Sequence, residues 1–191
     1  TYLTRVEEVI DWSLNQGLVT SLDFHGSHLK SDFLKTFDSS ESAYTDPTSA
    51  RRAADNAKFR AIWTKLADTF KDKGYNLVFE IINEPYWYMS KAEMDTLNSE
   101  LLAIIRVGGN NPDRNIIVTG GGQTSYNAIT QLDPTLFGSD PNRLIGTFHY
   151  YNPWSFTNSS GDSQDTESWG ASDESSVDSE FAYVSSWANT N

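Results

Sequence analysis

Asn83, Glu84 and Pro85 place a carboxamide and a carboxylate side by side where an apolar run stops. That run, residues 77–82, is rich in β-branched and aromatic residues, and Pro85 cannot donate to a strand ladder, so a buried strand should end there. Side chains at the C-terminal ends of parallel strands line the active sites of barrels. A carboxyl group there, beside an amide that can bind a sugar hydroxyl, suits acid/base catalysis at a glycosidic bond. A glutamate in a turn before a proline is the alternative that these three residues leave open.

Other kinds of site have less support in the sequence. His25 and His28 stand three residues apart, but no third ligand follows at a spacing known for metal sites, so we expect no metal. The glycines at 120–122 lack the Lys-Ser/Thr ending of a phosphate loop and the spacing of a dinucleotide fingerprint, which predicts an ordinary loop after a strand. The chain has no cysteine, which excludes a thiolate nucleophile and a disulfide framework. We therefore expect no cofactor.

The composition limits the kinds of partner. The 191 residues suffice for one domain with a buried core. Fourteen basic against 26 acidic residues give a net charge of −12, which disfavours nucleic acid and anionic membranes and fits a neutral polysaccharide. Six tryptophans and nine tyrosines could stack on sugar rings or fill a core. No apolar run approaches the about 18 residues of a membrane span, no signal peptide is visible, and no obligate protein partner is indicated.

Strand-like and helix-like segments alternate along the chain. Apolar residues at helical spacing mark four of the five or six expected helices, at Val6–Leu14, Phe59–Phe70, Met94–Ile105 and Val177–Trp187. Four apolar runs predict strands at 18–24, 77–82, 115–119 and 144–150. Gly17 is expected to cap the first helix, and Ser90 with Glu93 to form a capping box. The alternation predicts one parallel sheet with right-handed crossovers and its strands in chain order.

Five stretches, in one order along nearly the whole chain, resemble the family 5 glycoside hydrolases, the family of cellulases and mannanases. They are Arg5–Trp12 with Gly17 and Leu18, Leu22–His25, Phe59–Trp63, Phe79–Pro85, and Phe148–Pro153 with Phe156 and Thr157. The likeness is closest to the bacterial endoglucanase-type members. It implies an α/β fold, the (β/α)8 TIM barrel, and a secreted enzyme that hydrolyses β-1,4-glycosidic bonds in a cellulose-type polysaccharide by a retaining mechanism.

The resemblance implies a role for each matching polar side chain. Glu84 would be the acid/base, and Asn83 would bind the sugar 2-hydroxyl. His149 and Tyr151 match the family's His-x-Tyr pair and would orient the carboxylates and hold the sugar. We expect these four side chains to converge at the C-terminal ends of the strands. A core histidine and a core tyrosine are the alternative for the latter two.

Further substrate contacts are implied around these four residues. His25 matches the first of two adjacent histidines in close relatives, and Gly26 replaces the second, so one contact on the substrate side would be missing. His28 in the following loop could reach the site or be solvated. Trp87 and Trp154 follow the strand-end motifs and could form platforms for sugar rings or pack against neighbouring loops.

The remaining carboxylates are not expected to be nucleophiles. Glu80 precedes Glu84 by four residues, which places it about 13 Å deeper along the strand, and Asp23 stands where the resemblance would place an asparagine. Both are expected to be interior groups paired by hydrogen bonds. The acidic residues between 162 and 174 lie in a serine-rich stretch that predicts a solvated loop.

The number of strands is lower than a complete barrel needs. A (β/α)8 barrel has eight strands and typically about 250 residues, whereas this chain offers four. Aligned by its motifs, it runs from the family's second helix to its sixth, about strands 3–6 with flanking helices. We therefore expect residues 1–191 to be a single partial catalytic domain without the nucleophile strand, inactive in isolation. A native half-barrel, a carbohydrate-binding or scaffold piece, and a mannanase or xyloglucanase remain as alternatives.

Overall fold

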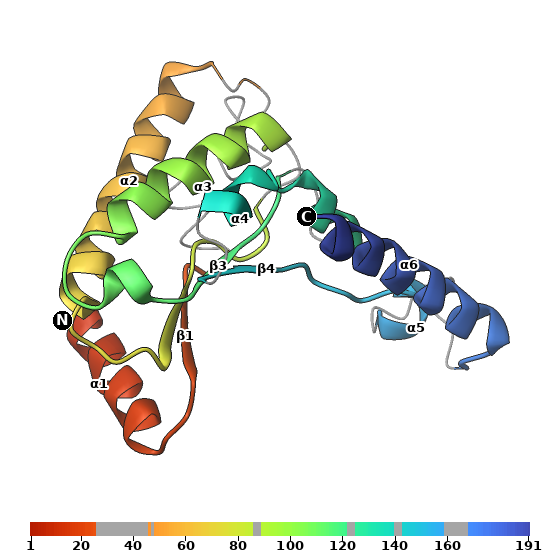
Figure 1. The fold of residues 1–191 in the computed structure, drawn as a ribbon, viewed down its shortest axis with the longest axis horizontal. Coiled ribbons are helices and arrows are strands. Elements are labelled where there is room, and N and C mark those ends of the chain that lie inside the picture. Colours follow the sequence, from red (N-terminus) through yellow and green to blue (C-terminus); the bar gives the residue numbers. More distant parts are fainter. Residues whose placement is uncertain (26–45, 47, 86–88, 122–124, 140–142, 159–167) are drawn as a thin grey trace.

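The computed structural model describes residues 1–25, 46, 48–85, 89–121, 125–139, 143–158 and 168–191. Its centre is one parallel sheet of four strands whose spatial order is their order in the chain. The strands are β1 (Thr20–Asp23), β2 (Leu77–Glu80), β3 (Ile116–Val118) and β4 (Leu144–Gly146) (Figure 1). The expected parallel sheet in chain order is therefore confirmed.

The register divides the side chains of the sheet into two rows. One row carries Leu22, Phe79, Ile116 and Leu144, which are opposite one another across the four strands. Phe79, Ile116 and Leu144 belong to the hydrophobic core beneath the helices, and Leu22 packs against that core. The next row carries Asp23, Glu80, Ile117 and Ile145 and projects from the other face, because neighbours along a strand point to opposite sides. Ile145 is 45% exposed on that face.

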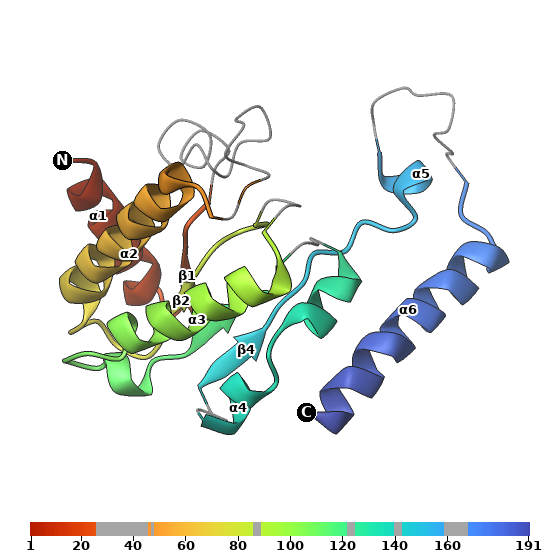
Figure 2. The same cartoon turned by 90° about the horizontal axis from the view of Figure 1, so that it is seen from above.

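Three helices cover the core side of the sheet: α1 (Tyr2–Asn15), α2 (Ala50–Phe70) and α3 (Lys91–Ile105) (Figures 1 and 2). Trp63 of α2 is fully buried, and its indole Nε1 donates to the Ile81 carbonyl over 3.0 Å. Its ring lies 5.6 Å from that of Phe79. Through Trp63, α2 thus packs against and hydrogen-bonds the end of β2, just before the Asn83–Glu84 pair.

The positions of the predicted helix caps are confirmed. Gly17 follows α1 with φ of +76°, and its amide donates to the Leu14 carbonyl over 2.9 Å. Ser90 is the N-cap of α3, and its hydroxyl accepts from the Glu93 amide over 3.2 Å. This bond satisfies an amide group that the first turn of α3 leaves without a helical partner.

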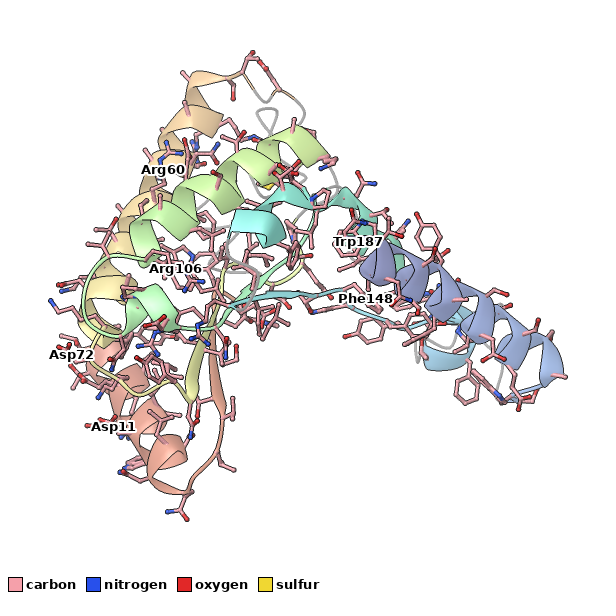
Figure 3. The ribbon with its side chains drawn as sticks, in the orientation of Figure 1. Asp11, Arg60, Asp72, Arg106, Phe148 and Trp187 are labelled. Carbon is pink, nitrogen blue, oxygen red and sulfur yellow. The ribbon has the colours of Figure 1, made fainter. Side chains whose placement is uncertain are left out.

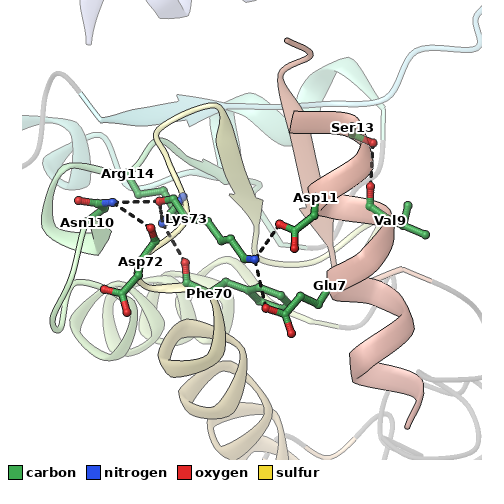
Figure 4. A network of polar contacts seen from close by, with 9 residues as sticks. All are labelled: Glu7, Val9, Asp11, Ser13, Phe70, Asp72, Lys73, Asn110 and Arg114. Atoms are coloured by element: carbon green, nitrogen blue, oxygen red, sulfur yellow. Dashed lines mark hydrogen bonds and ion pairs between the residues drawn. The ribbon is translucent and has the colours of Figure 1, made fainter. Parts of the chain in front are cut away.

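At the opposite end of the strands, Arg114 ties the turn between α2 and β2 to the sheet. Its guanidinium donates to the carbonyls of Phe70 over 3.1 Å, Lys73 over 2.9 Å and Leu77 over 2.7 Å. Burial lowers the pKa of this side chain. Lys73 in the same turn reaches α1, with Nζ 2.7 Å from Asp11 Oδ1 (Figure 4). The predictions from sequence did not single out Arg114.

Shorter helices flank the last two strands. They are η4 (Asn111–Asp113) before β3, η5 (Tyr126–Gln131) and α4 (Thr135–Ser139) after it, and α5 (Trp154–Thr157) after β4. Gly120, directly after β3, has no room for a side chain, since a Cβ would lie 2.2 Å from the Ala128 carbonyl oxygen of η5. The predicted loop after β3 is confirmed for Gly120 and Gly121, while Gly122 lies outside the described residues.

The last helix, α6 (Ala171–Thr190), lies apart from α1–α3 and runs beside the chain that follows β4 (Figures 1 and 2). It begins earlier than expected. Asp173 and Glu174, predicted to lie in a loop, are in its first turn, where the Gly170 amide donates to the Asp173 carboxylate over 2.9 Å. Acidic groups favour a helix N-terminus because of its exposed amides. The acidic residues at 162, 165 and 167 lie outside the described residues.

The prediction of a strand over 144–150 is wrong for its second half, because β4 ends at Gly146. The described neighbour of β4 is β3, which ends at Val118, and the Thr147 amide still donates to the Val118 carbonyl over 2.9 Å. Beyond that bond the sheet offers no ladder partner among the described residues. Residues 148–152 therefore leave the sheet and run along α6, where Phe148 and Trp187 mark the junction (Figure 3).

Candidate active site

Glu84 and His149 meet at the C-terminal ends of the strands. His149 Nδ1 lies 2.6 Å from Glu84 Oε1, and the two side chains are 30% and 37% exposed. Glu84 follows β2 and His149 follows β4, so the contact passes over the end of β3. The expected convergence of these two residues at one end of the sheet is confirmed. A partly exposed carboxyl group held by an imidazole is suited to exchange a proton with a ligand.

The chain takes an irregular path at Glu84. Its φ is +41°, the only positive φ of a non-glycine residue in the part of the chain that the structure describes. Such a conformation costs of the order of 1–3 kcal/mol, and strained conformations of this kind cluster at functional sites. Asn83 next to it is buried, and its backbone amide donates to the Phe24 carbonyl over 3.1 Å. The irregular strand end, predicted from Pro85 and the need for both side chains to reach one site, is confirmed.

A second pair lies at the end of β1. His25 Nδ1 is 2.6 Å from Asp23 Oδ2, and Asp23 is mostly buried, whereas His25 is 66% exposed. The two side chains are two residues apart and lie on one face. Asp23 has the partner that its interior position was predicted to need, and that partner is His25. The exposed ring of His25 is accessible to a ligand from the same end of the sheet as Glu84.

Glu80 is opposite Asp23 in the register of β1 and β2. Burial raises the pKa of Glu80, and the charge of Asp23 raises it further, while His149, His25 and a hydrogen bond to Ser21 act in the other direction. Glu80 is therefore an interior carboxyl group with a hydrogen-bond partner, as expected. It lies level with the end of β1, four residues before Glu84 in the chain.

Two aromatic residues lie beyond His149. The rings of Tyr151 and Trp154 meet edge to face at 6.4 Å, and they are 55% and 61% exposed. The Tyr151 carbonyl accepts from the Thr157 hydroxyl of α5 over 2.5 Å, which fixes the turn between them. Both rings present surface on which a sugar could stack. Trp87 and His28, also predicted near the site, lie outside the described residues.

Sequence reasoning missed one contact of this region. Glu180 of α6 accepts hydrogen bonds from Tyr150 and Asn152, on either side of Tyr151. A single glutamate in an exposed helix gives no signal in the sequence, because the pairing depends on where α6 docks. Among the described residues, no cluster of three or more His, Asp or Glu side chains could hold a metal ion. No described helix is long and apolar enough to cross a bilayer.

The sequence model of the family described as Cellulase (glycosyl hydrolase family 5) matches residues 1–191. The chain belongs to glycosyl hydrolase family 5. Endoglucanase H of Acetivibrio thermocellus is 35% identical over 192 residues, a match that covers 100% of this chain and 18% of that protein. The resemblance that five short stretches indicated is thereby confirmed.

Solved structures of family 5 enzymes superimpose on the whole fold. XEG5A, a xyloglucan-specific endo-β-1,4-glucanase from a metagenomic library, matches with a TM-score of 0.77 at 29% identity, over 97% of this chain and 53% of that one. Endoglucanase Cel5A of Thermotoga maritima matches with a TM-score of 0.77 at 26% identity, over 100% of this chain and 56% of that one. The chain thus spans about half the length of these two structures.

This family 5 chain therefore forms part of a (β/α)8 barrel, as expected. In such a barrel the helices are outside, so the face that carries Asp23, Glu80 and Ile145 is the interior. Glu84 and His149 lie at the C-terminal rim, the end at which barrel enzymes bind substrate.

Proposed function

We propose that the protein containing residues 1–191 is an endo-acting β-1,4-glucanase in which Glu84 is the acid/base. The observation that carries this proposal is the contact of 2.6 Å between Glu84 and His149 at the rim of the barrel. The family supports a glycoside hydrolase, and the relatives named above are endoglucanases by their printed names. The strained φ of Glu84 supports a functional role for that residue.

The proposed reaction is retaining hydrolysis by two carboxyl groups about 5–5.5 Å apart. Glu84 gives its proton to the glycosidic oxygen as that oxygen leaves, while a carboxylate attacks the anomeric carbon and forms a glycosyl ester. Glu84, now ionised, takes a proton from water as the water attacks that ester and frees the carboxylate. His149 holds one oxygen of Glu84 in place through both steps.

We place the attacking carboxylate outside residues 1–191. The interior carboxylates of the described sheet, Asp23 and Glu80, are the last residues of β1 and β2, whereas Glu84 lies beyond the strand end. On this proposal residues 1–191 form one partial catalytic domain that is inactive alone. A non-catalytic carbohydrate-binding role for the isolated chain is the second candidate, favoured by the exposed Tyr151 and Trp154 rings.

The substrate proposed is a cellulose-type β-glucan. Asn83 would bind the 2-hydroxyl at the cleavage point, His25 and Tyr151 would hold the same sugar, and Trp154 with Trp87 would stack on neighbouring rings. XEG5A was solved in complex with cellotriose, which supports a β-1,4-linked glucan as the class of ligand. A polymer of this kind is degraded outside the cell, so we also propose that the protein is secreted.

Glu84→Gln in the full-length protein tests the proposal. The amide cannot give a proton, so hydrolysis of cellohexaose should fall by about 10²–10⁴-fold. The first-turnover release of dinitrophenolate from 2,4-dinitrophenyl β-cellobioside should fall far less, because its leaving group departs without protonation. The kcat/KM values on the two substrates, which report the steps up to glycosyl-ester formation, give the comparison. Glu174→Gln, an exposed glutamate of α6, is the control and should leave both rates unchanged. Equal losses on both substrates in Glu84→Gln would show that Glu84 is not the acid.

A further inference from the structure

In the segment that follows β4, alternate side chains point in opposite directions. His149 contacts Glu84, and Tyr151 packs against Trp154, both on the side of the site. Phe148 and Tyr150 turn the other way, and their rings lie 6.1 Å and 5.0 Å from Phe181 of α6. The segment is thus held from behind by α6 while it presents His149 to the acid/base. Figure 3 shows Phe148 at this junction.

One carboxylate of α6 fixes the segment at two points. Tyr150 Oη donates to Glu180 Oε2 over 2.6 Å, and Asn152 Nδ2 donates to Glu180 Oε1 over 2.9 Å. Hydrogen bonds to an ionised acceptor are roughly twice as strong as those between neutral groups. Burial first, and then the hydrogen bond and charge of Glu180, raise the pKa of Tyr150 to about 12, so its hydroxyl remains a donor at neutral pH. Residues 150 and 152 are therefore clamped on either side of Tyr151.

We propose that Glu180 is a positioning residue of the acid/base site, which holds residues 149–152 so that His149 keeps its contact with Glu84. The inference rests on the proposed function of Glu84. Glu180 does not touch that carboxyl group and acts through the backbone of the segment that it clamps. Errors of about 1 Å in the placement of catalytic groups can cost about 10²-fold in rate. Loss of the clamp should therefore weaken proton donation in particular.

Glu180→Ala and Glu180→Gln in the full-length protein form the test. Glu180→Ala removes both acceptors and should lower kcat/KM for cellohexaose by about 10–10²-fold. The loss on 2,4-dinitrophenyl β-cellobioside should be clearly smaller. Glu180→Gln should recover most of the rate, because its amide oxygen can accept from Asn152 while its amide nitrogen donates to the Tyr150 oxygen. Asp178→Asn, which removes an exposed carboxylate from the same helix, is the matched control and should behave as wild type.

The outcomes separate this inference from the proposed function. If Glu84→Gln shows the substrate difference but Glu180→Ala lowers both rates equally, or neither, Glu180 is only structural and the inference is overturned. If Glu84→Gln shows no substrate difference, the proposed function itself fails. Should Glu180→Ala not fold, Tyr150→Phe decides, since it removes one bond of the clamp and keeps the ring against Phe181. It should show the same substrate difference with a smaller loss, and equal losses would overturn the inference.

Discussion

Ionisable side chains cluster on the interior face of the sheet near the C-terminal ends of its strands. Asp23 binds His25 at the end of β1, Glu80 lies opposite Asp23, and Glu84 binds His149 above them. Asp23 and Glu84 each have an imidazole as partner, whereas Glu80 has a carboxylate as its neighbour in the register. Burial and the like charge of Asp23 raise the pKa of Glu80 and favour its neutral form. In this respect Glu80 differs from the carboxyl groups that contact histidine.

Asp23→Asn should change the titration of Glu80. Because burial and the Asp23 charge raise the pKa of Glu80 above 4.5, its ordinary value, ionisation of Glu80 opposes folding. The corresponding stability is full at acid pH and is lost as pH rises through the raised pKa. Asp23→Asn removes the like charge, so the pKa of Glu80 should fall toward its ordinary value and Tm should decline less steeply above that pH. Asparagine keeps an acceptor for His25.

Carboxyl ¹³C NMR of the full-length protein measures this directly, with Glu80→Gln to assign the resonance. A matched control is Asp178→Asn, which removes one charge from α6 and should leave the Glu80 titration as it is in wild type. An unchanged pKa of Glu80 in Asp23→Asn would mean that burial alone raises it and that the two carboxyl groups do not interact.

The single residues of the site were predictable to different degrees. Glu84 was found because it ends an apolar run, and His149 because it matches the family's His-x-Tyr pair. The ends of parallel strands meet at one edge of the sheet, which predicted their contact. The irregular turn at Glu84 followed from parity, since neighbours on a regular strand cannot face one site. The left-handed φ of Glu84 was not predictable, because only the surrounding structure can hold a non-glycine residue there. The partner of Asp23 was likewise decided by geometry.

Helices and strands were predictable where local patterns determine them. Gly17 and Ser90 end and begin helices through bonds to residues three or four positions away, so the sequence carries the signal. Strand ends depend on neighbours far along the chain, which is why β4 stops at Gly146, level with the end of β3, although the apolar run continues. Arg114 was missed for the same reason, as its acceptors lie about 40 residues earlier in the sequence.

Arg114→Met should destabilise the protein strongly. The buried guanidinium satisfies the carbonyls of Phe70, Lys73 and Leu77 and lies 4.7 Å above the Phe79 ring. Hydrogen bonds to a charged group contribute about 1.5–3 kcal/mol each, so loss of the three bonds should lower the free energy of unfolding by at least about 3 kcal/mol. Urea titration of the full-length protein, followed by tryptophan fluorescence, measures the change.

Arg60→Met is the control for that measurement. Arg60 of α2 pairs with Glu100 of α3 over 2.8 Å, but both side chains are about a third or more exposed (Figure 3). Exposed ion pairs contribute about 0–1 kcal/mol, so this substitution should have a small effect. Similar losses in the two variants would contradict the role given to Arg114, because its buried hydrogen bonds would then contribute no more than an exposed ion pair.

The whole molecule is best understood from the two faces of its sheet. One face is covered by α1–α3 and closed by the core, while the other carries Ile145 at 45% exposure beside polar groups. In the described part of the chain, β1 pairs only with β2, and β4 only with β3. Unpaired strand edges and an exposed isoleucine on the open face are expected where further strands complete the sheet. The barrel expected from the sequence explains both features, and the chain spans about half of its solved relatives.

The most direct test of the central claim is azide rescue of Glu84→Ala in the full-length protein. With 2,4-dinitrophenyl β-cellobioside, the glycosyl ester should form without an acid and then persist, because no base activates water. Azide needs no base, so it should accelerate turnover, and NMR should identify β-cellobiosyl azide, with the configuration of the substrate retained. That result would establish Glu84 as the acid/base of a retaining glucanase. An α-configured azide would make Glu84 the nucleophile, and no rescue by azide would contradict its catalytic role.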